Sequence, residues 1–150
     1  RDLRIRAVTD SPDAFGAVLD EVVRESDDYW QGLAAGFADE RHTLLIGFAG
    51  DEAIGTAYAR LSNDRIGHIG AMWIDPRYRR QGSGELLLRA AIEWHAAKGA
   101  DVIHLWVTEG NFPATQLYFA NGFTMAGDRQ PLREGSELDR LLMQRAVSVR

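Results

Sequence analysis

The sequence predicts a single α/β domain with a mixed, mostly antiparallel central sheet flanked by helices. Three apolar segments, 42–49, 53–61 and 66–74, follow one another with short polar turns between them, which is typical of an antiparallel meander. A loop, a helical pattern over 85–98 and a compact apolar strand over 101–107 come next, and such a unit requires a parallel strand pairing. The sheet is therefore expected to be mixed.

The two ends of the chain supply the remaining elements. Alternation of apolar and polar residues over 3–7 predicts a first strand. Ser11-Pro12 is a typical helix start, and apolar residues at three-and-four spacing over 15–23 predict a helix after it. A shorter helix is predicted over 30–37, although its two glycines weaken the pattern. The last expected elements are a helix over 113–121 and strands near 123–127 and 138–147.

Composition excludes several functional classes. Seventeen Lys and Arg against 22 Asp and Glu give a net charge of −5, which argues against general nucleic-acid binding. Without cysteine there is no disulfide, thiolate metal site or catalytic thiol. Apolar stretches such as 44–49 are far shorter than the roughly 20 residues of a membrane span, and the first residues lack a signal-peptide core. We expect one cytoplasmic domain over 1–150, with Arg1 in place of Met suggesting a trimmed start.

A loop rich in glycine and arginine lies between the third meander strand and the helix. Its residues, from Arg79 to Gly84, stand where the N–H groups of a helix start have no internal partners, which favours an anion. Gly82 and Gly84 allow close approach of the backbone, while Arg77, Arg79 and Arg80 add positive charge that can meet phosphates. A solvated turn with glycines for geometry and arginines for solubility is the alternative interpretation.

Two short motifs narrow the identity of the anion. No Lys-Ser or Lys-Thr follows the glycines, which excludes a P-loop, and Leu87 occupies the third glycine position of the dinucleotide fingerprint. The run from Arg79 to Gly84 instead resembles the acetyl-CoA motif of the Gcn5-related N-acetyltransferase family: Arg or Gln, two free positions, Gly, one free position, then Gly or Ala. Residues 111–123 resemble its second signature, with an Asn, an Ala three later, a Leu-Tyr pair and Gly-Phe. Motif agreement covers about residues 66–125.

The resemblance implies acetyl-CoA as acyl donor and assigns its binding residues. In the family, the strand before the loop splays from its parallel neighbour and pairs with the pantetheine arm, which maps onto Met72, Trp73 and Ile74. Asn111 would contact the same arm or, as the alternative, cap the helix that begins near Pro113. The pyrophosphate would lie against the backbone N–H groups of the loop and helix start, formed by Arg79, Arg80, Gln81, Gly82, Ser83, Gly84 and Glu85.

Tyr118 is the residue that the resemblance implies for the chemistry. A phenol with a pKa of about 10 can protonate the departing CoA thiolate, the alternative being a packing aromatic. The attacking amine needs a base, a water chain or a low pKa of its own; His68 occupies a strand position where some family members have a glutamate, the alternative being a structural histidine. Trp106 stands at another family glutamate position, which closes that route unless Glu109 replaces it. We expect no metal, because no ligand spacing connects His42, His95 and His104.

The acceptor site is expected to come from the first helices and the last strands. Tyr29, Trp30, Phe37 and the loop 129–137 are candidates for lining a groove, with burial in the core as the alternative for Trp30 and Phe37. Three acidic residues at the end of the first helices, Glu25, Asp27 and Asp28, could attract a cationic amine. Such a run of charges is usually a solvated surface.

The resemblance thus implies an acetyl-CoA-dependent N-acetyltransferase that transfers an acetyl group to a primary amine of a small molecule by direct attack. The net negative charge slightly favours a small cationic amine. The alternatives are a protein N-terminal or lysine acetyltransferase, a non-catalytic CoA-binding regulatory module, and a phosphate binder unrelated to CoA. The expected partners are acetyl-CoA and the amine acceptor, with neither nucleic acid nor membrane, in a monomer or a homodimer.

Overall fold

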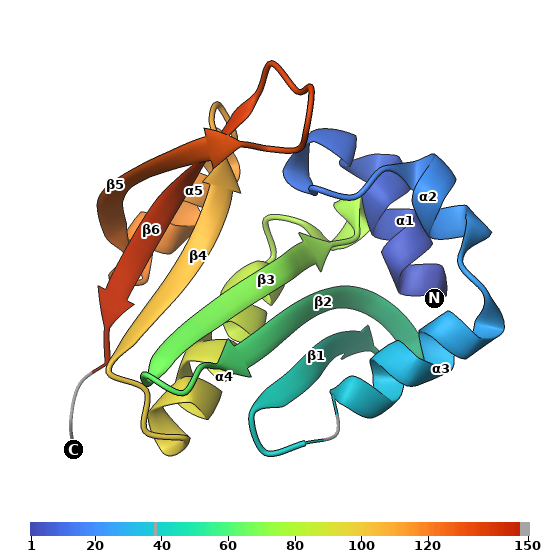
Figure 1. Ribbon diagram of the computed structural model, residues 1–150. Helices are drawn as coiled ribbons and strands as arrows, with labels where there is room; N and C mark the ends of the chain where they lie inside the picture. The colour runs from blue at the N-terminus through green and yellow to red at the C-terminus, as the bar shows by residue number, and fades with distance from the viewer. Residues whose placement is uncertain (38, 148–150) are drawn as a thin grey trace.

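A six-stranded sheet forms the centre of the chain in the computed structural model, which describes residues 1–37 and 39–147. The strand order is β1-β2-β3-β4-β6-β5 (Figure 1). β3 and β4 pair in parallel, and the other neighbouring strands of the sheet pair antiparallel, which confirms the predicted fold class. The strands are β1 (His42–Ala49), β2 (Glu52–Leu61), β3 (Ile66–Ile74), β4 (Val102–Thr108), β5 (Thr124–Pro131) and β6 (Asp139–Ala146).

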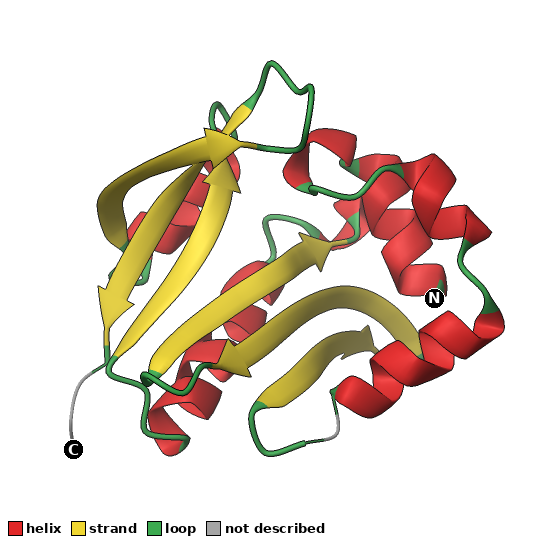
Figure 2. Cartoon of the chain, viewed as in Figure 1, coloured by secondary structure: helices red, strands yellow, loops and turns green. Residues whose placement is uncertain are grey.

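Helices cover the sheet on both sides. α4 packs across β1, β2 and β3 and lies behind the sheet with α5, whereas α1, α2 and α3 gather beside β1, β2 and the end of β3 (Figure 2). No helix among the described residues is both long and apolar enough to cross a membrane. The helices are α1 (Asp2–Asp10), α2 (Leu19–Arg24), α3 (Asp27–Gly36), α4 (Ser83–Ala97) and α5 (Phe112–Ala120), with 3-10 turns at Pro12–Ala14 and Pro76–Tyr78.

Close packing of β3 on α4 depends on a glycine. A Cβ at Gly67 would lie 2.3 Å from Cδ2 of His95, so another residue there would push the helix away from the sheet. The His95 ring is fully buried, with Nδ1 2.8 Å from the Ala91 carbonyl oxygen and Nε2 3.1 Å from the Arg60 carbonyl oxygen. His95 is therefore a core residue that links α4 to β2.

The predicted first strand over 3–7 is wrong, because these residues belong to helix α1. Alternation over five residues does not separate the two structures, since Leu3 and Ala7 are also one helical turn apart. Ala7 and Val8 are buried against Phe15, Val22 and Trp73. Packing of this helical face onto the sheet end decides the conformation, and that partner is distant in the sequence.

The continuous helix predicted over 15–23 is also wrong. The chain forms a 3-10 turn at Pro12–Ala14, is extended at Phe15 and Val18, and becomes helical again only in α2. The carbonyl oxygen of Phe15 accepts a hydrogen bond of 2.9 Å from Arg133, and a Cβ at Gly16 would lie 3.3 Å from the Leu132 carbonyl oxygen. This contact with a distant loop replaces the local helical pairing. The helix predicted over 30–37 is present as α3 and begins three residues earlier.

Candidate active site

The two parallel strands separate at the centre of the sheet. β3 and β4 pair from Ile66 with Val102 to Ile69 with Leu105, and their pairing does not continue although β3 extends to Ile74 and β4 to Thr108. A slot of about 70 Å³ lies at the point of separation. Its walls come from both strands, from α5 and from the turn before α2: Ala14, Phe15, Ile69, Gly70, Ala71, Met72, Trp106, Val107, Asn111, Ala114 and Tyr118.

A bulge in β3 lies beside the slot. Tyr58 of β2 pairs with Gly70 and Thr56 pairs with Trp73, so the two β3 residues between them face a single β2 residue. Ala71 has φ +50°, a left-handed conformation that is uncommon for alanine and that turns the main chain out of the regular ladder. A Cβ at Gly70 would lie 2.9 Å from the Tyr58 ring, so glycine there admits the ring across the strand. Met72 lines the slot directly after the bulge.

The glycine-rich loop joins the end of β3 to the start of α4. Gly82 is the residue before the helix and has φ +85°, and Arg80 is also left-handed with φ +60°. The first bond of the helix runs from the Leu86 N–H to the Gly82 carbonyl oxygen, so the N–H groups of Ser83, Gly84 and Glu85 in the first turn have no partner within the helix. These groups, together with the positive helix end, can bind an anion.

Two of the loop arginines are already paired with carboxylates. Arg77 contacts Glu52 and Asp75, and its guanidinium holds the pKa of the Asp75 carboxyl well below the usual range. Arg79 pairs with Asp10 of α1 and donates to the Ile74 carbonyl oxygen at 2.9 Å. Their charges therefore stabilise the loop against α1 and β2. The main chain of the loop, with exposed Arg80 and Gln81, is left to meet a ligand.

Trp73 and Ile74 contribute to the site mainly by their main chain. The Trp73 side chain is buried, and its Nε1–H donates to Asp10 at 3.0 Å, which fixes the end of β3 to α1. The Ile74 side chain packs near Gly84, where a Cβ would lie 3.7 Å from Ile74 Cγ1. The side chains are thus engaged in packing, and the strand edge beyond Ile69 is not paired with β4.

Tyr118 and Asn111 both line the slot. The Tyr118 side chain is 6% exposed, its ring lies 6.0 Å from that of Phe123, and burial raises its pKa to about 12. The phenol is therefore protonated throughout the physiological range. Asn111 caps α5, since its Oδ1 accepts a hydrogen bond of 3.4 Å from the Ala114 N–H. The capping role expected as one alternative for Asn111 is therefore present, in a residue that also faces the slot.

The candidate bases lie away from the slot. His68 is half-buried at 5.8 Å from the His104 ring and lines neither the slot nor the groove described below; burial lowers its pKa, and Arg60 and His104 lower it further. Glu109 is exposed and pairs with Arg129 at 2.9 Å. Trp106 of β4, which stands at a glutamate position of the family, lines the slot and has no basic group. Within the described residues, no group of three or more His, Asp or Glu side chains is placed to bind a metal.

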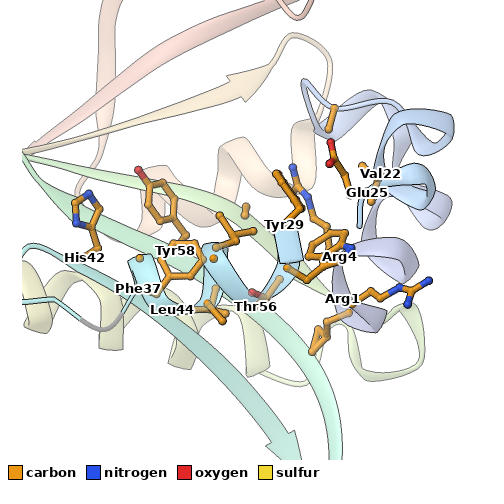
Figure 3. Close-up of a pocket in the computed structure, with 18 of the residues that line it drawn as sticks. Arg1, Arg4, Val22, Glu25, Tyr29, Phe37, His42, Leu44, Thr56 and Tyr58 are labelled. Carbon is orange, nitrogen blue, oxygen red and sulfur yellow. The ribbon is translucent and has the colours of Figure 1, made fainter. Parts of the chain in front are cut away.

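A wide groove of about 860 Å³ lies on the side of the sheet covered by α1, α2 and α3 (Figure 3). Three predicted lining residues, Tyr29, Trp30 and Phe37, are among its walls, and so is Glu25. Asp27, Asp28 and the segment 129–137 are not, and residues 129–131 of that segment belong to β5. The groove shares Ala71 with the slot.

Sequence reasoning missed the walls that come from α1, β1 and β2. Leu44 and Ile46 alternate with inward residues on β1 and are 38% and 42% exposed. Alternating apolar residues on the open side of an edge strand were the available indication of a ligand surface. Tyr58 and Thr56 complete the β2 wall, and Arg4 enters from α1, a helix that the sequence pattern did not predict.

The chain is similar to known acetyltransferases in sequence and structure. Residues 8–123 match the profile of the acetyltransferase (GNAT) family. A mycothiol acetyltransferase from Thermobispora bispora is 31% identical over 122 residues, which cover 81% of this chain and 41% of that protein. A streptothricin acetyltransferase from Streptomyces lavendulae is 34% identical over 101 residues, which cover 66% of this chain and 52% of that protein. The chain thus spans about two fifths of the mycothiol acetyltransferase and half of the streptothricin acetyltransferase.

Solved structures agree with this relationship. A GCN5-related N-acetyltransferase from Kribbella flavida has a TM-score of 0.75 at 18% identity, covering 95% of this chain and 88% of that chain, which shows the same fold. The crystal structure of nourseothricin acetyltransferase has a TM-score of 0.67 at 25% identity, covering 75% of this chain and 69% of that chain. The profile match spans more than half of the sequence and includes the slot, the loop and Tyr118. The chain belongs to the acetyltransferase (GNAT) family.

Proposed function

We propose that this domain transfers the acetyl group of acetyl-CoA to a primary amine of a small molecule by direct attack. The observation that carries the proposal is the meeting of the narrow slot and the wide groove at Ala71. A donor in the slot and an acceptor in the groove would meet at this residue. The names of the relatives, mycothiol and streptothricin acetyltransferase, support a small-molecule acceptor.

The residues around the slot suit acetyl-CoA. The unpaired edge of β3 at Met72, Trp73 and Ile74 offers main-chain groups to the amides of a pantetheine arm. The start of α4 at Gly82 and Ser83 offers N–H groups and a positive helix end to the diphosphate. In this proposal, backbone geometry does most of the donor binding, and Asn111 keeps the α5 end of the slot in place by capping that helix.

Tyr118 would serve as the acid in this reaction. The amine nitrogen forms a bond to the thioester carbonyl carbon, the carbon–sulfur bond breaks, and the sulfur leaves as a thiolate that needs a proton or a strong hydrogen bond. Tyr118 lines the slot, and its phenol stays protonated because burial raises its pKa to about 12. It can therefore donate to the departing sulfur at neutral pH.

The proton of the attacking amine needs another destination. His68 lies outside both cavities, so it could accept this proton only through intervening water. A His68→Gln variant tests whether His68 accepts this proton. We expect kcat/KM to fall by less than about threefold and the acidic limb of its pH profile to persist. Loss of that limb would instead assign His68 as the base.

Thiol release from acetyl-CoA in the presence of a panel of amines tests the proposal directly. We expect release with at least one small primary amine, and a thermal shift with acetyl-CoA that ADP at the same concentration does not match. A thermal shift without thiol release for any amine, peptide or aminoglycoside would indicate a non-catalytic CoA-binding module. Equal shifts with ADP and acetyl-CoA would indicate a phosphate binder unrelated to CoA.

A further inference from the structure

The groove contains a cationic side chain that the proposed reaction does not use. Arg4 of α1 lines the groove (Figure 3). Its guanidinium lies over the Phe15 ring, 4.9 Å from the ring centroid. Nearby arginines are paired: Arg1 lies 3.4 Å from Asp27, and Arg6 contacts Asp75. Among the described residues, no carboxylate forms an ion pair with Arg4. The groove thus has a cation available to a ligand.

The surroundings of Arg4 make an unpaired charge unfavourable. The side chain is partly buried over the Phe15 ring; this burial lowers the pKa of its guanidinium, and the interaction with Tyr29 offsets part of the shift. Partial desolvation of a cation without an ion-pair partner is unfavourable, and a bound carboxylate would offset part of that cost. The guanidinium also presents paired N–H donors that match the two oxygens of a carboxylate. The groove carboxylates Glu21, Glu25 and Asp39 are exposed, so water screens them.

Arg4 lies close to the place where the acetyl group would be transferred. Phe15, which contacts the Arg4 guanidinium, also lines the slot, and Ala71 belongs to both cavities. A ligand held by Arg4 could therefore reach the junction with an amine only a few bonds from its anionic group. Beyond this point most of the groove wall is apolar and aromatic, with Phe37, Leu44 and Ile46 among its residues. Asp39 and His42, which also line the groove, contact each other at 2.9 Å.

Resting on the acetyl transfer proposed above, we propose that the acceptor is an amine of the amino-acid type, with a carboxylate bound by Arg4 and an apolar side group in the groove. Arg4 would then be a specificity-determining residue of the acceptor site. This class is narrower than the cationic amine expected from net charge, because a polycation would place further positive charge beside Arg4.

A binding experiment tests the Arg4 subsite without requiring turnover. Calorimetry would compare 3-phenylpropionate with 3-phenylpropionamide, which differ in the carboxylate. We expect wild type to bind the carboxylate at least tenfold more tightly, Arg4→Gln to lose this preference, and Arg4→Lys to keep part of it. Arg24→Gln is the control, because Arg24 is exposed on α2 and does not line the groove. This variant should keep the full preference for the carboxylate. Thermal unfolding of each variant shows that it is folded.

A turnover experiment tests the substrate class. Thiol release would be measured with L-phenylalanine, L-leucine, their amides and 1,4-diaminobutane. We expect the acids to have the higher kcat/KM in wild type, and Arg4→Gln to reduce it at least tenfold for the acids and less than twofold for the amides. Equal binding of the carboxylate and amide probes, equal losses on both substrates, or preference for the diamine would overturn the proposal. Failure of acetyl transfer itself would show as no thiol release from any amine, while the binding experiment still reports on Arg4.

Discussion

The slot and the groove are built in different ways. The slot arises where β3 and β4 stop pairing, and the donor-binding groups proposed for it are main-chain groups of the strand edge and the start of α4. The groove arises where three N-terminal helices lie over β1 and β2, and its features are side chains such as Trp30, Leu44 and Tyr58. The loop and α5 lie within a short part of the sequence, although the slot walls also include Ala14 and Phe15, whereas all groove walls come from residues 1 to 71.

Under the proposed function, this difference would allow one chemistry to be combined with different acceptors. A donor bound mainly through main-chain groups depends on the fold and on a few glycines, so most side chains around it are free to vary. An acceptor bound through side chains depends on each of those residues. We therefore expect changes in the slot to alter turnover or donor affinity for all acceptors, and changes in the groove to alter one acceptor relative to another.

The largest expected effect is that of Tyr118→Phe. Removal of the hydroxyl should lower kcat by about 100-fold, in the range of general acid catalysis, because the thiolate loses its proton donor. The ring keeps its packing against Phe123, so the Kd for acetyl-CoA should stay within about twofold. Steady-state kinetics with calorimetry of donor binding measures both quantities. Unchanged turnover would show that Tyr118 is a packing residue.

The next effect concerns the two glycines at the ends of α4. Gly82 and Gly99 have φ +85° and +81°, and a Cβ at either would meet no atom within 4 Å. Alanine should therefore destabilise the fold equally at both positions, by about 1 kcal/mol. In addition, Gly82→Ala should weaken acetyl-CoA binding about tenfold, since it shifts the N–H groups of the first turn, whereas Gly99→Ala should not. Equal donor affinities of the two variants would remove the loop from the donor site.

A smaller, acceptor-specific effect is expected for Leu44→Ala. Leu44 lines the groove, so loss of its side chain should raise the acceptor KM about fivefold, corresponding to roughly 1 kcal/mol of lost apolar contact. The donor Kd should not change. Phe48→Ala is the matched control, because Phe48 lies on the same strand, is 61% exposed and is outside the groove walls. An equal rise in the acceptor KM of both variants would contradict the assignment of the groove as the acceptor site.

The smallest effect concerns His95, which is buried between α4 and the sheet. Burial lowers its pKa from 6.5, so the unfolded chain takes up a proton more readily than the folded chain. The contribution of His95 to stability is therefore complete above pH 6.5 and decreases as the pH falls below that value. The difference in Tm between wild type and His95→Gln should narrow by a few degrees between pH 7.5 and pH 5. A widening difference would show that the folded state binds the proton.

The sequence predicted the sheet, α4 and the family motif better than the N-terminal helices and the groove that they cover. The meander, α4 and β4 have strong local patterns, and the motif around Gly82 and Tyr118 is specific. The end of pairing between β3 and β4 and the bulge at Ala71 have no such pattern, because both depend on how strands far apart in the chain fit together. The same is true of α1, whose helical form depends on packing against Trp73. Arg4 was missed for this reason.

Helix α1 connects the two halves of the site. Asp10 contacts Arg79 and Trp73 next to the donor loop, Arg6 contacts Asp75, and Arg4 lines the groove. Substitutions that retune acceptor choice through α1 would therefore also disturb the thioester side. Helix α3 has no fully buried residue, and Trp30 is its residue that packs against the core, so its other positions can diverge with little effect on folding. In the evolution of new acceptor preferences, α3 should be the freest element and α1 among the most constrained.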